Sequence, residues 1–186
     1  MEKTAKVLRV LTVPNLMAAI MAAVLGYTSR ISWYEAIIMI FFLGIFPCFA
    51  YILAYIVPKW REEGRTMQRK LAVVFSVTGY VGGIAAAFLC NMSIISKVVY
   101  LTYLLSGAFI FISSALGFPA SGHSCGVAGP VAILCVYVSL WWLFGIAAEV
   151  LAFVSSLTAK RHTFLQLTAG CAAALCAFFI ALFILT

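Results

Sequence analysis

Continuous apolar stretches, each long enough to cross a lipid bilayer, occupy most of this 186-residue chain. A transmembrane helix needs about 20 predominantly apolar residues, and runs without alternation favour helices over the strands of a membrane β-barrel. The pattern predicts helices over residues 7–27, 34–57, 71–92, 97–117, 121–138, 141–158 and 163–185. The predicted fold is therefore an all-α transmembrane bundle, with about six to seven membrane helices in a single domain over residues 1–186.

The division of the run from Gly126 to Val154 decides the predicted topology. With about 29 residues, this run is too long for one ordinary span and short for two. Ser139, Trp141 and Trp142 lie near its middle, and tryptophan favours the headgroup level of a membrane. We therefore expect a hairpin at this point, with one span on either side of it.

The composition agrees with a membrane-embedded chain, since 66% of the residues are hydrophobic and only 9% are charged. The first apolar run follows Lys3, Lys6 and Arg9, as in a signal peptide, but it is too long for the apolar region of one, and we expect a retained helix. The six cysteines show no spacing typical of a metal site, so we expect no disulfide, metal or other cofactor.

The cations are distributed unevenly between the predicted loops. If the N-terminus is cytoplasmic, the loops on that side hold ten of the twelve lysines and arginines, and the other side holds only Arg30 and Lys97. This positive-inside bias predicts such an orientation in a cell membrane. Without the predicted hairpin, His162 would lie on the opposite side from His123. With it, three polar segments share the cytoplasmic face, namely 58–70, 118–124 and 155–163.

The first polar segment carries five of the cations, Lys59, Arg61, Arg65, Arg69 and Lys70. Such a cluster can contact anionic lipid headgroups beside a membrane span. It can also bind a phosphate, because arginine offers paired donors to phosphoryl oxygens and lysine offers a point charge. This segment alone leaves both interpretations open. We expect lipids as partners and no nucleic acid.

The second polar segment holds His123, one of only two histidines in the chain. Ser121-Gly122-His123 begins a predicted helix after Pro119, and the exposed N–H groups of a helix N-terminus favour an anion. Ser121 can equally be an ordinary N-cap, with His123 as an interfacial residue.

The third polar segment holds the other histidine, His162, directly after Lys160 and Arg161. Such a cluster is also typical of a membrane interface between two spans. Gln166 lies one helical turn further on, where its side chain would hold one ring nitrogen and leave the other for a substrate. Because histidine gives and takes protons near neutral pH, the two segments together suggest chemistry on an anion.

Taken together, the three segments resemble the signatures of the type 2 phosphatidic acid phosphatase superfamily of membrane lipid phosphatases. That family combines Lys-x6-Arg-Pro, Pro-Ser-Gly-His and Ser-Arg-x5-His-x3-Asp. Here the second signature is Pro119-Ala120-Ser121-Gly122-His123, with one extra alanine, and the third extends from Ser155 to Gln166 with its spacing intact. Arg161-His162-Thr163 followed by Gln166 is similar to a prokaryotic branch in which glutamine replaces aspartate. The resemblance covers about residues 58–170.

The resemblance implies a metal-independent phosphatase that forms a phospho-histidine intermediate. His162 would attack phosphorus while Gln166 orients its ring, and His123 would protonate the leaving oxygen. The implied substrates are lipid phosphates or prenyl (di)phosphates. The phosphoryl oxygens would be bound by Ser121, Gly122, Lys59, Arg61, Arg65 and Arg161.

The chain also departs from the family pattern. Ser156 stands where the family has arginine, Gln166 replaces the aspartate, and the first signature is one residue short, with Thr66 in place of proline. Loss of one oxyanion donor commonly costs about 10²–10³-fold in rate. A catalytically weakened or inactive relative that binds lipid phosphates is therefore an alternative. Glu149, a carboxyl within an apolar run, gives a third hypothesis, a small transporter.

Overall fold

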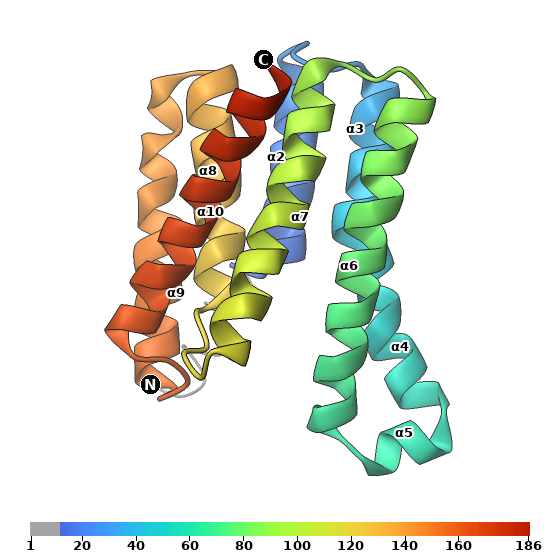
Figure 1. The fold of residues 1–186 in the computed structure, drawn as a ribbon, viewed down its shortest axis with the longest axis vertical. Coiled ribbons are helices and arrows are strands. Elements are labelled where there is room, and N and C mark those ends of the chain that lie inside the picture. The colour runs from blue at the N-terminus through green and yellow to red at the C-terminus, as the bar shows by residue number, and fades with distance from the viewer. Residues whose placement is uncertain (1–11) are drawn as a thin grey trace.

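The computed structural model describes residues 12–186, and within this range the chain is an all-α bundle without strands (Figure 1). Its elements are α2 Pro14–Tyr27, α3 Trp33–Met39, the π-helical turn η1 Ile40–Ile45, the 3₁₀ turn η2 Phe46–Cys48, α4 Phe49–Ile56, α5 Pro58–Glu62, α6 Arg65–Leu89, α7 Ile94–Ala115, α8 Gly122–Tyr137, the 3₁₀ turn η3 Leu140–Gly145, α9 Ile146–Thr158 and α10 Phe164–Leu185.

Most of these elements are suited to a lipid environment. Five segments are long and apolar enough to cross a membrane: Trp33–Ile56, Arg65–Leu89, Ile94–Ala115, Leu140–Thr158 and Phe164–Leu185. Helices α2 and α8 are shorter apolar helices. Large apolar side chains such as Phe111, Trp141 and Phe183 point outward and are highly exposed. An outer surface of this kind is stable in hydrocarbon, so the protein is membrane-embedded.

The predicted hairpin within the run Gly126–Val154 is confirmed. Helix α8 ends at Tyr137, and Ser139 caps the short turn η3, where its hydroxyl accepts a hydrogen bond from the N–H of Trp141 at 3.3 Å. Helix α9 then returns beside α8. The two halves of the run are thus separate antiparallel elements.

Two predicted helices differ in detail from the observed ones. Helix α6 begins at Arg65 rather than at residue 71, directly after Gly64, whose φ of +58° separates it from α5. The predicted helix 34–57 is interrupted at Pro47, which has no N–H to donate, and the backbone passes through a π-helical and a 3₁₀ turn there. Residues 7–11 of the predicted helix 7–27 lie outside the described range, and within that range the helix begins at Pro14 rather than at residue 12, after the extended N-cap Val13.

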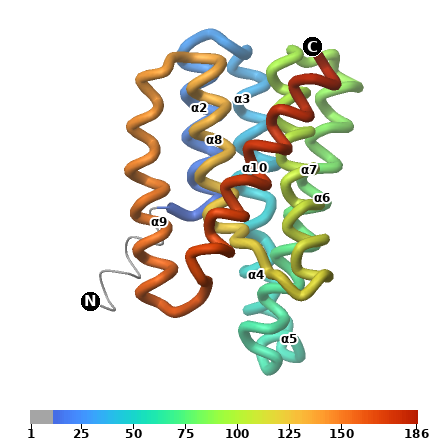
Figure 2. The backbone as a smooth tube through the Cα atoms, turned by 60° about the vertical axis from the view of Figure 1, so that its left-hand side comes forward, coloured from blue at the N-terminus to red at the C-terminus, as the bar shows by residue number. Residues whose placement is uncertain are grey.

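The direction of the helices places the three polar segments at the same end of the bundle. In Figures 1 and 2, α6, α8 and α10 begin at the lower end, where α7 and α9 finish. The turn α7–α8, the turn α9–α10 and the start of α6 therefore lie at this end. Helix α5 extends below the other helices.

At the opposite end, Glu35 joins the starts of α3 and α7. Its carboxylate accepts hydrogen bonds from the N–H of Ser32 at 3.2 Å, from the hydroxyl of Ser93 at 3.0 Å and from the N–H of Ser93. The hydroxyl of Ser32 in turn accepts a hydrogen bond from the N–H of Glu35, which completes a capping box. Since Ser32 and Ser93 are the N-caps of α3 and α7, one buried carboxylate interacts with two helix N-termini.

We expect Glu35→Ala to lower the free energy of unfolding by about 2–4 kcal/mol, because it leaves several buried donors without an acceptor. Thermal unfolding of the detergent-purified protein, followed by tryptophan fluorescence, measures the effect. Glu62→Ala is the matched control, because Glu62 is exposed on α5. Equal transition temperatures of the two variants would contradict this structural role.

Candidate functional site

The second polar segment forms the N-terminus of α8. Ser121 is the buried N-cap, and its hydroxyl accepts a hydrogen bond from the N–H of Ser124 at 3.3 Å. A Cβ built on Gly122 would have no neighbouring atom within 4 Å, so open space adjoins the first turn. The first N–H groups of a helix have no acceptor within it and carry partial positive charge. An anion can therefore approach this end of α8 closely.

The third polar segment forms the N-terminus of α10 through a capping box. The N–H of Gln166 donates to the hydroxyl of Thr163 at 3.3 Å, and the N–H of Thr163 donates to Oε1 of Gln166 at 3.0 Å. The predicted contact between His162 and Gln166 is present, because Nδ1 of His162 lies 3.3 Å from the same Oε1.

The capping box also fixes the protonation pattern of the His162 ring. The Gln166 atom that accepts from the N–H of Thr163 is necessarily the amide oxygen, which cannot donate. Nδ1 of His162 is therefore the nitrogen that carries hydrogen and donates to this oxygen. In the neutral ring, the lone pair is then left on Nε2, the atom that can act as a base or nucleophile.

The two helix N-termini are in direct contact. The N–H of Ser121 donates to the main-chain carbonyl of Gln166 at 2.8 Å. Gly170, one turn further along α10, faces the same place: a Cβ there would lie 2.3 Å from the carbonyl oxygen of Ser121. The absence of a side chain at Gly170 is what lets α10 approach α8 this closely. The second and third polar segments thus form one unit.

A cavity of about 1100 Å³ opens beside this unit, between α6, α7, α8 and the start of α2. At its polar end it is lined by Gly122, His123, Arg161 and the first turns of α6. Above this end, the apolar side chains of Val73, Val77, Ile110 and Phe111 line the cavity, and the innermost part also carries the hydroxyl groups of Tyr80, Thr102, Tyr103 and Ser106. The cavity therefore combines a cationic end with an apolar wall.

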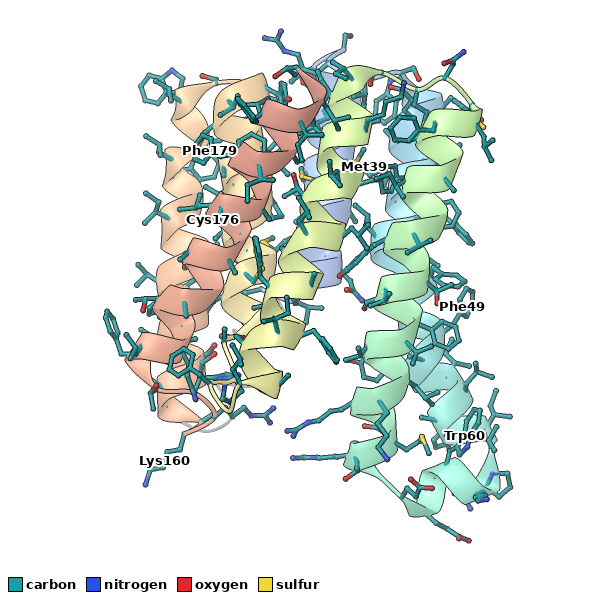
Figure 3. The ribbon with its side chains drawn as sticks, viewed as in Figure 1. Met39, Phe49, Trp60, Lys160, Cys176 and Phe179 are labelled. Carbon is teal, nitrogen blue, oxygen red and sulfur yellow. The ribbon has the colours of Figure 1, made fainter. Side chains whose placement is uncertain are left out.

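Helix α6 contributes a continuous stripe of residues to this cavity. They recur at helical spacing from the first turn: Arg65, Gln68, Arg69, Ala72, Val73, Ser76, Val77 and Tyr80, with Lys70 and Val74 beside them. Figure 3 shows long nitrogen-tipped side chains of lower α6 directed towards the lower ends of α7 and α10. The sequence analysis placed Arg69 and Lys70 in the same basic segment as Arg65, but it assigned only Arg65 of these three to the phosphate-binding residues. Extending the helical period back to residue 65 would have found them.

Arg161 reaches the cavity because of the way α9 ends. Lys160 adopts a positive φ of +49°, the N–H of Lys160 donates to the carbonyl of Leu157 at 3.0 Å, and that of Arg161 donates to the carbonyl of Ser156 at 3.1 Å. These two bonds form a Schellman motif. Ser156 is itself buried within α9. Arg161 is thus the cation that this segment supplies to the cavity.

Thr12 is a contact of His123 that the sequence prediction missed. Its buried hydroxyl lies 2.8 Å from Nε2 of His123, across 111 positions of sequence. No local spacing relates the two residues, and only the packing of α2 against α8 brings them together. This contact orients the ring of His123 at the edge of the cavity.

The predicted site residues divide into three groups. Arg65, Gly122, His123 and Arg161 line the cavity. Ser121, His162 and Gln166 belong to the joined N-termini of α8 and α10 beside it. Lys59 and Arg61 lie exposed on α5, below the bundle, and do not line the cavity. Within residues 12–186, no group of three or more histidine, cysteine, aspartate or glutamate side chains is arranged to hold a metal ion.

Comparison of the chain with protein-family models, with curated proteins and with solved structures finds no match. The functional conclusion therefore depends on the residues and the geometry of this site.

Proposed function

We propose that this chain is an integral-membrane phosphatase that hydrolyses a lipid phosphate or a prenyl (di)phosphate. The observation that carries the proposal is the cavity, in which four cations, Arg65, Arg69, Lys70 and Arg161, lie at one end together with His123. By charge bias, this end is proposed to face the cytoplasm. A phosphate would bind there through charge-assisted hydrogen bonds.

The remainder of the cavity supports a substrate with an apolar tail. Val73 and Val77 of α6 face the cavity with Ile110 and Phe111 of α7, and Phe111 is 69% exposed on the outer surface. Hydrocarbon in this space would remove apolar surface from water while the headgroup stays at the cationic end. A soluble phosphate ester would leave the apolar part unused.

The chemistry would use both histidines. Nε2 of His162 would attack phosphorus as the bond to the leaving oxygen breaks, giving a phosphoryl-histidine, and His123 would give that oxygen a proton. Water would then attack phosphorus, releasing inorganic phosphate and restoring His162. The cations and the N–H groups of α8 would stabilise the charge on the equatorial oxygens.

The extent of the cavity favours this function over transport. The innermost lining residue on α7 is Thr102, and on α6 it is Tyr80, which lies about 22 Å along the helix from Arg65 at 1.5 Å per residue. Beyond them Tyr100 is completely buried, and it packs so closely on α6 that a Cβ on Gly83 would lie 2.1 Å from its ring. On α6 and α7, the lining of the cavity does not extend past this packed layer.

Phosphate release from a panel of lipid phosphates and prenyl diphosphates by the purified protein tests the proposal. We expect release from at least one substrate, and the panel then ranks headgroups and tails. Saturable binding of these lipids without release would instead support the alternative of an inactive lipid-phosphate binder. That alternative is motivated by Ser156 and Gln166, which replace a guanidinium and a carboxylate of the family pattern.

Arg161→Gln is expected to lower kcat/KM about 10²–10³-fold, because it removes a guanidinium from the cationic end of the cavity. Lys59→Gln is the matched control, since it removes one charge from exposed α5 outside the cavity. We expect its rate to stay within about threefold of wild type. Equal losses in the two variants would mean that general surface charge, and not the cavity, attracts the substrate.

A further inference from the structure

Three side chains from three helices form a polar cluster within the membrane-spanning region. A carboxylate oxygen of Glu149 on α9, Oε1, is hydrogen-bonded with the hydroxyl of Ser124 on α8 and lies 3.1 Å from the thiol of Cys171 on α10. The hydroxyl of Ser124 also lies 3.0 Å from the main-chain carbonyl of Leu167. The second oxygen of Glu149, Oε2, is buried and has no hydrogen-bond partner.

The positions of the donors favour a protonated carboxyl group. Ser124 has a single hydroxyl proton, and the carbonyl of Leu167 can only accept. If Glu149 carries a proton on Oε1, it donates to Ser124 and Ser124 donates to Leu167. The thiol of Cys171, 3.0 Å from the hydroxyl of Ser124 and 3.1 Å from Oε1, then donates to one of these two oxygens. If Glu149 is ionised, the one proton of Ser124 has to serve both the carboxylate and the carbonyl. The neutral acid therefore satisfies the cluster better.

Among residues 12–186, no charged side chain compensates a carboxylate at Glu149. The titratable side chains that interact with it are the thiols of Cys171 on α10 and Cys125 on α8. Within residues 12–186, no lysine, arginine or histidine side chain forms an ion pair with this carboxyl. A membrane segment accommodates a neutral, hydrogen-bonded acid far better than an unpaired carboxylate.

A chain of hydrogen bonds connects this cluster to the candidate site. Ser124, the partner of Glu149, donates its N–H to the hydroxyl of Ser121 at 3.3 Å. Ser121 donates its own N–H to the carbonyl of Gln166 at 2.8 Å, and the side chain of Gln166 holds Nδ1 of His162. Glu149 is thus connected to the ring of His162 through Ser124, Ser121 and Gln166.

Among the described residues, Glu149 makes the only side-chain hydrogen bonds that join α9 to another helix. It lies at the outside of the bundle (Figure 2), and large apolar side chains such as Val150 and Val154 face away from the protein. The hydrogen bonds of Glu149 are those that tie it to α8 and α10. Because α9 leads directly into the turn that carries Arg161 and His162, its position sets the position of that turn.

We propose that Glu149 is a positioning residue, a neutral carboxylic acid that fixes α9 against α8 and α10 and thereby holds His162 in place. The inference rests on the proposed phosphatase function and deepens it. It also argues against a role of Glu149 as an ion-transport site, since a carboxyl that keeps its proton during turnover carries no charge across the membrane.

The first test compares Glu149→Gln with Glu149→Leu in the full-length protein. With its NH2 in the place of Oε1, glutamine can donate to the hydroxyl of Ser124, and the thiol of Cys171, 3.0 Å from that hydroxyl, can donate to it as well. We therefore expect Glu149→Gln to keep kcat within about threefold of wild type with an unchanged pH profile. We expect Glu149→Leu to lower kcat at least about tenfold with little change in KM, because a displaced reacting group slows the chemical step. Val150→Leu is the control on the outer face of α9 and should match wild type.

The outcomes distinguish the possible roles of the carboxyl. Loss of activity in Glu149→Gln equal to that in Glu149→Leu would overturn the proposal, because it would require the ionisable group itself. A Glu149→Leu protein that is less stable but retains kcat would also overturn it, since the role would then be structural alone. A wild type that releases no phosphate would instead overturn the proposed function on which the inference rests.

Infrared spectroscopy tests the protonation state without any substrate. The chain has only five acidic side chains, so the carbonyl stretch of a protonated carboxylic acid is easily assigned. At pH 8 we expect this band in wild type and in Val150→Leu, and its loss in Glu149→Gln. Wild-type spectra without the band would show that Glu149 is ionised. A band of unchanged intensity in Glu149→Gln would show that it comes from another carboxyl group, and either result would overturn the proposal.

Discussion

The substitution His162→Ala is expected to lower phosphate release at least about 10³-fold, because it removes the atom that would form the covalent intermediate. The effect is expected in kcat rather than in KM, since the cations that would bind the phosphate remain. His162 is half-buried, and its described side-chain hydrogen bond is the one to Gln166, so the fold should tolerate alanine. Malachite-green detection of released phosphate with the best substrate of the panel provides the measurement.

Lys160→Ala is the matched control for this experiment. Lys160 is exposed and lies two positions before His162, in the same turn between α9 and α10 (Figure 3). Removing its side chain alters the local charge without touching the ring, and we expect a change of less than about threefold. Gel filtration of all three proteins establishes that they are equally folded. Residual turnover in His162→Ala comparable to that of Lys160→Ala would exclude His162 as the nucleophile.

The substitution Gly170→Ala is expected to have the second largest effect, on both stability and activity. Its Cβ would lie 2.3 Å from the carbonyl oxygen of Ser121, and a main-chain atom cannot turn aside as a side chain does. We expect a loss of about 1–3 kcal/mol in the free energy of unfolding. Separating α10 from α8 would also break the contact of Ser121 with Gln166, and a displacement of about 1 Å costs about 10²-fold in rate.

Gly129→Ala is the control for Gly170→Ala, because it adds the same methyl group at the same helix pair. A Cβ at Gly129 would lie 3.8 Å from the Cβ of Ala174, which is ordinary contact. We therefore expect a nearly unchanged transition temperature and nearly unchanged kcat for this variant. If Gly129→Ala and Gly170→Ala behave alike in both measurements, the close approach at Ser121 is not what holds the site together.

The predictions that depend on local spacing agree well with the structure. The lengths of the apolar runs located the long helices α7 and α10 within about three residues at each end, and Trp141 and Trp142 correctly marked the hairpin between α8 and α9. Gln166 contacts His162 as expected, because residues four positions apart lie on one face of a helical turn. Each of these features depends on residues that are close in the sequence.

The predictions that needed the relative position of helices were less complete. Lys59 and Arg61 are grouped with Arg65 in the sequence, yet the break at Gly64 leaves them on α5, away from the cavity. Arg69 and Lys70 line it instead, because α6 begins earlier than its apolar run. Charged first turns do not show in an apolar pattern, although the helix continues through them.

The sequence by itself determined that this protein is an all-α membrane bundle whose two histidine segments lie at one end. Hydrophobic length and helical spacing are local properties, and they are sufficient for that conclusion. Only the tertiary structure decided which side chains meet: Thr12 with His123, Gly170 with Ser121, and Glu149 with Ser124 and Cys171. Such contacts depend on close packing between helices, and the volume of a side chain determines them only once its neighbours are in place.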